Sequence, residues 1–425
     1  MTGKCGLHVV MVTNVVAPDK LGGLERYVRE LSQELVRQGN AVTVISKMTS
    51  PDQTDVEEYP DGVKVMRYRV PPKEDPLFAL KYPYFVAKGV RQALSRALGA
   101  SSPARTVVHG HFPLPMLPLV MKGIPYVYTC HAPVYKEILD ERQDSYRLPC
   151  WAQGALVGVF KYAERLVLKR ATRVVTLSQF VSREVSALTR QDPDTIVRIP
   201  GGLDTNWFSP SPGSVIEGLR EDPGPLIFTA RRLVSRTGVE ELLRAMPLIL
   251  DHEPTTKLAI AGDGPLRPRL QQVVEELDLG QAVSILGRIS EPELRDWYRK
   301  ADIAVTPTRN LEGFGLSTVE AMACGTVPLV TPVAANPEIV GQLSPILIAP
   351  DIDAHGIADG IVSLWHSTEY EFLRSSVRQA VHPQLSWPSV CTKYLSLYRD
   401  VTGDRLAHSQ PRTRQVAVSL EDSST

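Results

Sequence analysis

The sequence has no surplus of charge of either sign. Its 425 residues include 47 Lys and Arg and 47 Asp and Glu, so the formal net charge is zero. A dedicated nucleic-acid binder carries a visible basic footprint, so no nucleic-acid partner is predicted. Long apolar runs are absent too, which excludes a transmembrane helix of about 18 or more apolar residues. The opening "MTGKCGLHVVMVTN" has the short apolar run of a first buried strand and does not resemble a signal peptide.

Cysteine is scarce, and no two cysteines have the spacing of a metal or redox site. The sequence therefore predicts reduced thiols in a cytoplasmic protein. The five cysteines are Cys5, Cys130, Cys150, Cys324 and Cys391. One basic, amphipathic segment, 155–170, is expected to dock on its own domain. Contact with a membrane surface is the less favoured interpretation of that segment.

Short apolar runs alternate with helical patterns along most of the chain. Near-continuous apolar strands between helices indicate a parallel sheet with both faces covered, which is the doubly wound α/β class. The helical segment 24–39 ends on Gly39. The predicted strands are 7–14, 41–46, 63–70, 106–111, 125–132, 173–178, 225–233, 256–264, 282–289, 302–308, 326–332 and 344–350.

A stretch rich in Pro, Gly and Ser at 209–225 divides this alternation into two parts. We predict two Rossmann-like domains, 1–211 and 212–385, which face each other across a central cleft. A helix at 386–402 is expected to return to the first domain, and 403–425 to be a disordered tail. Ligands of such sheets bind beyond the carboxyl ends of the strands.

The stretch "EGFGLSTVEAMACG" begins at Glu312 and places a second carboxylate, Glu320, eight residues later. A glycine-flanked turn opens a helix here. The backbone N–H groups of Phe314, Gly315 and Leu316 would form its N-terminus, which is a ready anion site. Carboxylates beside a phosphate would be repelled by it, so they are better suited to sugar hydroxyls. An ordinary capped helix, with Glu312 favouring the dipole, explains the spacing equally well.

The stretch "RRLVSRTG" at 231–238 places three arginines between a strand and a helix. A cationic turn in that position is typical of an anion site. Because side chains alternate along a strand end, Arg231 is expected to point away from the site that Arg232 faces. We therefore predict a structural role for Arg231.

These motifs resemble the retaining glycosyltransferases of family 4, which are two-domain GT-B enzymes related to glycogen and sucrose synthases. Glu312 to Gly325 resembles the E-x-F-G-x4-E-A signature of that family. Further stretches agree in order and spacing over about residues 7–400. They are "GGLERY" (22–27), "HGH" (109–111), "TCHAP" (129–133), "PGGLDTNWFSP" (200–210), "AGDGPLRPRL" (261–270) and "LGRISEPELRDWYRKADI" (286–303).

The resemblance implies roles for the residues of the second domain. The leaving diphosphate would be held without a metal by an Arg and a Lys in the cationic turn and by the helix near Gly315. Arg232 matches that Arg, whereas the Lys position falls on Thr237, so Arg236 is predicted to replace it. Glu312 is implied to hold the hydroxyls of the transferred sugar and Glu320 those of the ribose.

The resemblance also implies roles for residues of the first domain, and for most of them a purely structural role remains the alternative. His131 would contact a donor hydroxyl near the reacting carbon, and His111 the acceptor, although a strand-end histidine is often structural. Gly22 and Gly23 would approach the donor phosphates or form an ordinary turn. Glu25 would contact acceptor or donor, or favour its helix dipole. Tyr135 is assigned to an acceptor pocket.

Two loops of the second domain are expected to pass the nucleotide base. Asp263 and Arg288 are the donor-binding residues predicted there, with a helix N-cap as the alternative role of Asp263. A rival motif, Asp351 and Asp353, has the Asp-x-Asp pattern of metal-dependent glycosyltransferases. It falls where family 4 has a plain loop, so no metal ligand and no cofactor are predicted.

Taken together, the motifs and the resemblance to family 4 imply a retaining, metal-independent glycosyltransferase. It would move a hexosyl or N-acetylhexosaminyl group from a nucleotide-diphospho sugar to a hydroxyl of a small molecule. A UDP-linked sugar is the predicted donor. Lipid and polysaccharide acceptors remain open. So do a GT-B epimerase or hydrolase of nucleotide sugars and a non-catalytic binding protein. The acceptor, the sugar, the nucleotide and the oligomeric state are not determined by the sequence.

Overall fold

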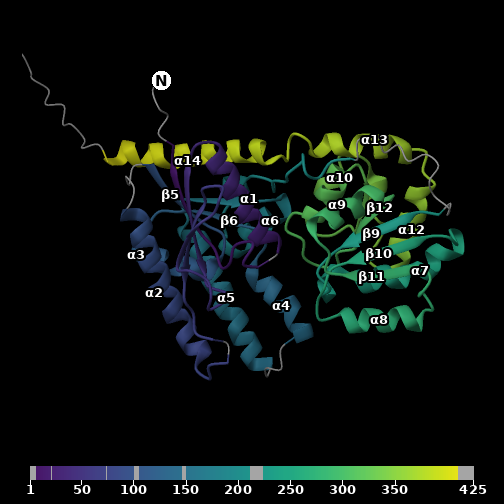
Figure 1. Ribbon diagram of the computed structural model, residues 1–425, viewed down its shortest axis with the longest axis horizontal. Coiled ribbons are helices and arrows are strands. Elements are labelled where there is room, and N and C mark those ends of the chain that lie inside the picture. The colour runs from purple at the N-terminus through teal and green to yellow at the C-terminus, as the bar shows by residue number, and fades with distance from the viewer. Residues whose placement is uncertain are drawn as a thin grey trace, which may run out of the picture.

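The computed structural model describes residues 6–20, 22–72, 74–99, 105–145, 150–210 and 224–409. The chain forms two α/β domains that lie side by side (Figure 1). We call residues 6–210 the N-terminal domain and residues 224–386 the C-terminal domain. The predicted fold class, two doubly wound Rossmann-like domains, is confirmed.

The N-terminal domain is built on an eight-stranded sheet of order β3-β4-β2-β1-β5-β6-β7-β8. Its pairs are parallel except β3 with β4. The chain winds to one side of β1 through β2 and then to the other side through β5, so β1 lies at the topological switch point. The strands are β1 (His8–Val12), β2 (Ala41–Lys47), β3 (Val56–Glu58), β4 (Lys64–Tyr68), β5 (Thr106–Gly110), β6 (Val127–Cys130), β7 (Arg173–Thr176) and β8 (Val197–Arg198).

The C-terminal domain has a five-stranded, fully parallel sheet of order β11-β10-β9-β12-β13. Here β9 occupies the switch point. Helices cover both faces, so central strands such as β10 and β12 are buried along most of their length. The strands are β9 (Leu226–Ala230), β10 (Lys257–Ala261), β11 (Val283–Gly287), β12 (Ile303–Thr306) and β13 (Val327–Val330).

The described helices follow the predicted alternation. Those of the N-terminal domain are α1 (Gly23–Arg37), α2 (Phe78–Gly99), α3 (Pro113–Lys122), α4 (Val134–Ser145), α5 (Cys150–Arg170) and α6 (Gln179–Thr189). Those that follow are α7 (Val239–His252), α8 (Arg267–Glu276), α9 (Glu291–Lys300), α10 (Leu316–Ala323), α11 (Asn336–Val340), α12 (Ala354–Trp365), α13 (Tyr370–Val381) and α14 (Trp387–Ser409). None of the helices within the described residues is long and apolar enough to span a membrane.

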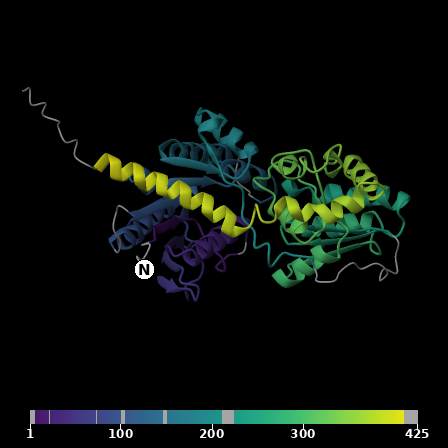
Figure 2. The ribbon, with the colours of Figure 1, turned by 90° about the horizontal axis from the view of Figure 1, so that it is seen from above.

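Helix α14 leaves the C-terminal domain and lies along the N-terminal domain (Figure 2). It packs on α1 and β5. The Tyr398 hydroxyl lies 2.6 Å from Nδ1 of His109 in β5, and the Tyr394 hydroxyl lies 2.8 Å from that of Tyr27 in α1. All four side chains are fully or almost fully buried, so this C-terminal helix completes the core of the N-terminal domain.

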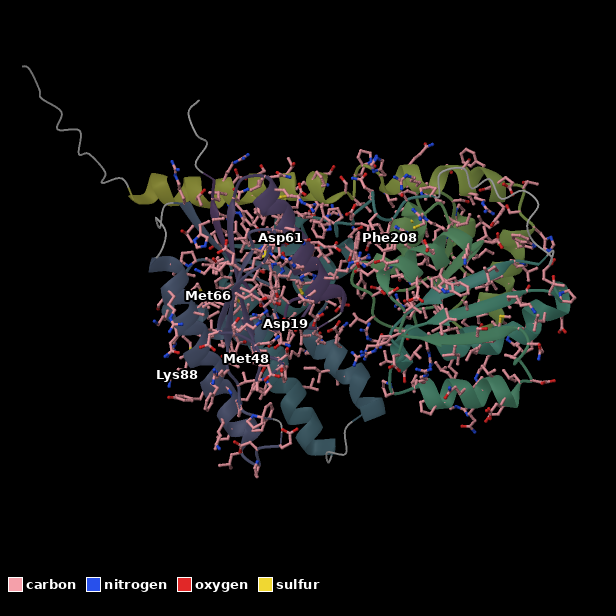
Figure 3. The ribbon with its side chains drawn as sticks, in the orientation of Figure 1. Asp19, Met48, Asp61, Met66, Lys88 and Phe208 are labelled. Carbon is pink, nitrogen blue, oxygen red and sulfur yellow. The ribbon has the colours of Figure 1, made fainter. Side chains whose placement is uncertain are left out.

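One apolar cluster continues from the first sheet into the second. Phe208, which Figure 3 labels beside the junction of the two domains, is fully buried in it. The Arg26 guanidinium of α1 lies 5.1 Å from the centre of its ring, and the Tyr298 ring of α9 lies 6.4 Å away. Phe208, which lies just before the predicted linker, therefore contributes a side chain to the contact between the domains, whereas most of that linker, 211–223, lies outside the described residues.

Two predictions about secondary structure are wrong. The apolar run 344–350 is not a strand, because Pro345 has no N–H group to donate and Pro345–Leu347 form a 3-10 turn. Ile348 makes only an isolated bridge to Val330. The predicted disordered tail from 403 is also wrong at its start, since α14 continues to Ser409; residues 410–425 lie outside the described part.

A buried carboxylate anchors the start of α4. Glu164 of α5 is fully buried and accepts the N–H groups of Val134 (3.0 Å) and Tyr135 (3.3 Å). Burial raises the pKa of Glu164 from 4.5 to about 7; the two N–H groups lower this pKa and the charge of Glu137 adds to the rise. The folded protein therefore holds a proton that the unfolded chain releases at lower pH.

This proton makes stability depend on pH through Glu164. Between about pH 4.5 and pH 7 the folded state binds more protons than the unfolded state, so the unfolding free energy falls as pH rises. We expect Glu164→Gln to remove that fall. Urea unfolding of both proteins at pH 5, 6, 7 and 8 measures the difference, and Glu276→Gln, on exposed α8, is the control. A constant difference between wild type and Glu164→Gln across this range would contradict the expectation.

Candidate active site

A cavity of about 570 Å³ lies between the two domains. Both switch-point strands point their carboxyl ends toward it, since the loops after β1 and β9 supply part of its wall. Most of the residues predicted from the sequence lie there together. They are Gly22, Gly23, His111, His131, Arg232, Arg236, Glu312, Phe314, Gly315, Leu316 and Glu320.

Two histidines form part of the wall from the N-terminal domain. His111 follows β5 and His131 follows β6, and His111 Nδ1 lies 3.1 Å from His131 Nε2. Burial lowers the pKa of His131 to about 3 and that of His111 well below 6.5, an effect to which the charges of His109 and His131 add. Both rings are therefore neutral at pH 7, and one of them donates to the other. Nε2 of His111 is buried without a hydrogen-bond partner among the described residues.

The opposite wall is the start of α10. Gly315, at the N-cap, has φ +85°, a left-handed conformation that glycine adopts without steric cost. Its N–H donates to Oε1 of Glu312 at 3.0 Å. The predicted set of three free N–H groups is therefore wrong at Gly315, because Glu312 already accepts that hydrogen bond and caps the helix from within its own loop.

Glu312 also forms an ion pair with Arg231. Its Oε2 accepts a hydrogen bond from Nη2 of Arg231 at 2.8 Å. Burial alone would raise the pKa of this carboxyl, but the charge and hydrogen bond of Arg231, the charge of Arg236 and the Gly315 N–H together lower it below 4.5. Glu312 is therefore ionised at neutral pH.

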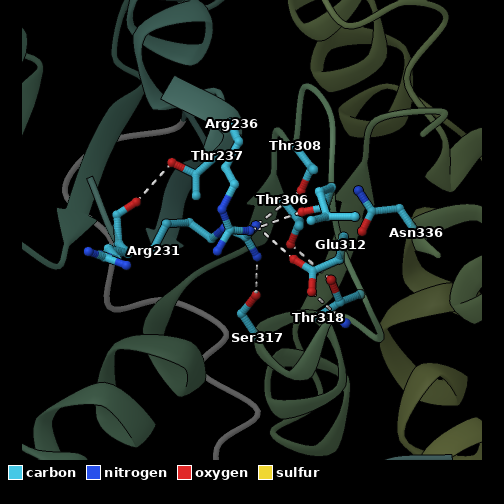
Figure 4. Close-up of polar contacts among 12 residues, drawn as sticks. Arg231, Arg236, Thr237, Thr306, Thr308, Glu312, Ser317, Thr318 and Asn336 are labelled. Carbon is cyan, nitrogen blue, oxygen red and sulfur yellow. Dashed lines mark hydrogen bonds and ion pairs between the residues drawn. The ribbon is translucent and has the colours of Figure 1, made fainter. Parts of the chain in front are cut away.

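Arg231 points into the cavity, and the prediction that it points away is wrong. Figure 4 shows Arg231 extending toward Glu312, Ser317 and Thr308. Strand alternation does not hold here because β9 ends at Ala230, one residue earlier. The side chain is 8% exposed and lines the same cavity as Arg232 and Arg236.

Arg236 reaches the cavity from the 3-10 turn Ser235–Thr237. Its Nη1 donates to the carbonyl oxygen of Leu311 at 3.1 Å, and its Nη2 lies 3.9 Å from a carboxylate oxygen of Glu137 in α4. Nε of Arg236 is buried with no hydrogen-bond partner in the described part of the chain. The neighbouring Arg232 is exposed and lines the same cavity.

Glu320, in the second turn of α10, is held from both domains. Nη1 of Arg26 in α1 donates to its Oε1 at 2.8 Å, and the Tyr298 hydroxyl donates to its Oε2 at 3.3 Å. Burial and the charges of Glu30 and Glu291 raise the pKa of Glu320, against the lowering effects of Arg26 and Tyr298. Arg26 is not among the predicted site residues, although it lies within the "GGLERY" motif, because nothing in the motif shows that its side chain crosses to the other domain.

Backbone contacts fix the two walls relative to each other. A Cβ on Gly313 would lie 2.0 Å from the carbonyl oxygen of His131, so any other residue there would force the domains apart. Ser178, the N-cap of α6, donates to the carbonyl oxygen of Gly313 at 2.8 Å and accepts the N–H of Val181. The carboxylate of Glu338 in α11 accepts the N–H groups of Gln179 and Phe180, so it caps the same helix from the other domain.

Four predicted site residues lie elsewhere. Asp263 and Arg288 do not line the cavity; they form an ion pair at 3.5 Å on the rim of the second sheet, and Leu266, not Asp263, is the N-cap of α8. Glu25 does not line the cavity, and its carboxylate pairs with Lys20 at 2.7 Å. Tyr135 packs in the N-terminal core, with Lys161 Nζ 5.3 Å from its ring centre.

The Asp-x-Asp motif has a structural function. Asp353 is the N-cap of α12, and its Oδ1 accepts the Gly356 N–H at 2.8 Å. Asp351 accepts the N–H of Ile352. No group of three or more His, Cys, Asp or Glu side chains that could hold a metal ion occurs within the described ranges.

Two facing parallel α/β domains, with guanidinium groups and paired carboxylates in the cleft between their switch points, define a GT-B glycosyltransferase architecture. The family comparison agrees. Residues 21–207 match the model described as Glycosyltransferase Family 4, and residues 216–379 match Glycosyl transferases group 1. The chain belongs to the GT-B glycosyltransferases of family 4.

Individual relatives match most of the chain. An uncharacterised glycosyltransferase of Methanocaldococcus jannaschii is 27% identical over 92% of this chain and 98% of its own. A D-inositol 3-phosphate glycosyltransferase of Kineococcus radiotolerans is 28% identical over 72% of each chain.

Solved structures share the fold at low sequence identity. Sucrose-phosphate synthase of Thermosynechococcus elongatus has a TM-score of 0.75 at 22% identity, covering 93% of this chain and 100% of that one. HepE of Anabaena, determined in complex with UDP and glucose, has a TM-score of 0.70 at 17% identity, with the same coverage.

Proposed function

We propose that the protein is a retaining, metal-independent glycosyltransferase that moves a hexosyl or N-acetylhexosaminyl group from a UDP-linked sugar to a hydroxyl of a small molecule. The observation that carries the proposal is the composition of one cavity. The guanidinium groups of Arg231, Arg232 and Arg236 and the first turn of α10 lie there together with the carboxylates of Glu312 and Glu320, and Arg26 adds a fourth guanidinium group beside Glu320. The cations would bind the diphosphate, and the carboxylates would accept hydrogen bonds from the hydroxyls of the sugar and the ribose.

The chemistry needs stabilisation of charge on the leaving diphosphate. Arg232, Arg236 and the N-terminal turn of α10 are positioned in advance for that charge, so little reorganisation is needed during the reaction. No metal ion is required for this role. Neutral His131 can accept or donate a hydrogen bond to a sugar hydroxyl without repelling Arg232 or Arg236.

The donor side of the cavity fits a sugar nucleotide. Glu312, ionised and fixed by Arg231, is assigned to the hydroxyls of the transferred sugar, and Glu320 to the ribose. Asp263 and Arg288, on loops beyond the cavity, are assigned to the base side. The UDP in the HepE complex supports the choice of uridine.

The acceptor side favours a small molecule. A cavity of about 570 Å³ is in the size range of small-molecule sites, and donor and acceptor must share it. The unpartnered Nε2 of His111 can hydrogen-bond an acceptor hydroxyl. A D-inositol 3-phosphate glycosyltransferase and a glycogen synthase of Mycobacterium tuberculosis are similar to this chain at 28% and 27% identity, so the choice of a small molecule rests on the cavity and not on the relatives.

A donor screen followed by an acceptor screen tests the proposal. Release of sugar from several UDP- and GDP-sugars is measured first, and an acceptor library is then screened by mass spectrometry in excess EDTA. We expect UDP-sugar turnover that EDTA leaves within about twofold, and an α-linked product from an α-linked donor. An inverted product or complete loss in EDTA would contradict it. An isomerised donor formed without acceptor would identify an epimerase instead.

A further inference from the structure

The cationic turn lacks a charge at the position where the family resemblance implies a lysine. Thr237 stands there, 3% exposed, in the 3-10 turn after β9. Its hydroxyl lies 2.8 Å from the carbonyl oxygen of Arg232 and 2.7 Å from that of Val234, as a donor (Figure 4). Thr237 is therefore occupied within its own turn and brings no charge to the cavity.

Arg231 brings a guanidinium into the same cavity from six residues earlier. It is anchored on one side by Ser317 (3.1 Å), Thr308 (3.1 Å) and Glu312 (2.8 Å). Ser317 is the second residue of α10, so the anchor places the guanidinium beside the N-terminal turn of that helix. The positive charge and the helix dipole therefore act on the same region.

Part of the hydrogen-bonding capacity of this guanidinium is unused. A guanidinium has five N–H donors, and the three contacts above leave others available. Nε of Arg231 is buried without a partner among the described residues, and so is Nε of Arg236. Buried donors without acceptors cost free energy, and both of these side chains line one cavity, where an oxygen-rich ligand would supply acceptors.

We propose that Arg231 is a further cation of the diphosphate site, beside Arg232 and Arg236, and supplies the charge that is absent at position 237. Glu312 fixes its orientation. The inference rests on the proposed function for the identity of the anion, a nucleoside diphosphate. It assigns to Arg231 direct contact with the phosphate distal to the nucleoside. A residue that only braced Glu312 would make no such contact.

Binding of UDP and UMP distinguishes an Arg231 that contacts the phosphate from an Arg231 that only holds Glu312 in position. The two nucleotides differ by the distal phosphate, so their affinities, measured by calorimetry, isolate that contact; ADP and GDP are titrated in parallel. We expect Arg231→Ala to weaken UDP binding about 10- to 100-fold and UMP binding less than about threefold. The exposed Arg309, which pairs with Glu241, lies outside the cavity, and Arg309→Ala is the control.

A second variant tests the replacement itself. Adding Thr237→Lys to Arg231→Ala returns a cation to the position that the resemblance implies, and we expect UDP binding to recover to within about fivefold of wild type. If Arg231→Ala fails to fold, Arg231→Lys, which keeps a charge beside Glu312, carries the test. We expect it to retain more UDP affinity than Arg231→Gln.

Three results would overturn the inference. They are unchanged UDP affinity in Arg231→Ala, equal losses for UDP and UMP, and no recovery with Thr237→Lys. A wild-type chain that binds UDP in this pattern but transfers no sugar contradicts the proposed function and leaves the inference standing. A wild-type chain that binds none of the three diphosphates overturns both.

Discussion

Replacing Glu312 by glutamine is expected to lower kcat/KM for sugar transfer by about 100-fold or more. The change keeps the shape of the side chain but removes the charge that holds Arg231 at 2.8 Å. It also removes one of two acceptor oxygens, since Oε1 binds the Gly315 N–H and Oε2 binds Arg231. The single amide oxygen could then accept either the Gly315 N–H or the Arg231 guanidinium, but not both in the present geometry. The start of α10 would lose either the hydrogen bond to Gly315 or the anchored charge of Arg231.

Initial rates with the donor found in the screen measure this effect, alongside the melting temperature. Glu276→Gln is the matched control, because its carboxylate is exposed on α8 and lies outside the cavity. We expect the control to stay within about twofold of wild type. Activity of Glu312→Gln within about threefold of wild type would contradict the role assigned to Glu312.

Tyr398→Ala is expected to lower the unfolding free energy by about 3–5 kcal/mol. Tyr398 of α14 is fully buried in the N-terminal domain, and its hydroxyl lies 2.6 Å from Nδ1 of His109. The change removes a buried ring and also leaves a buried imidazole nitrogen without its partner. His109 lies in β5, two residues before His111, and the centres of their rings lie 4.1 Å apart. Binding of the acceptor near His111 should therefore weaken as well.

Urea unfolding followed by tryptophan fluorescence measures the stability change. Tyr398→Phe removes the hydroxyl alone, and we expect it to cost about 1–2 kcal/mol. Tyr162→Ala, at a tyrosine that is 69% exposed on α5, should change stability by less than about 0.5 kcal/mol. Equal stability of Tyr398→Ala and wild type would show that α14 does not contribute to the folded N-terminal domain.

The two domains are held together by more than the linker. Arg26 reaches Glu320, Glu338 caps α6, and Gly313 packs on the backbone of His131. Each contact joins a residue near the cavity to the opposite domain. The geometry of the active site is therefore set by the contact between the domains as much as by either sheet.

Most of the fold could be predicted from the sequence because its signals are local. Apolar runs such as 41–46 and 302–308 became β2 and β12 within a residue or two of the predicted bounds. The prediction failed at 344–350, where Pro345 interrupts the apolar pattern, and at the tail, where a polar composition concealed the continuation of α14. The motifs also brought His131, Arg232 and Glu312 to one cavity, since the ends of parallel strands meet at the same edge.

The sequence by itself determined the alternating α/β pattern, the family and the positions of the motifs along the chain. Only the tertiary structure decided which polar side chains meet: Arg231 with Glu312, Arg26 with Glu320, and Tyr398 with His109. These partners are separated by 81, 294 and 289 positions. Arg231 lies just beyond the end of β9, where strand periodicity no longer holds, so its direction depends on the loop of Glu312 and the start of α10, which face it within the same domain.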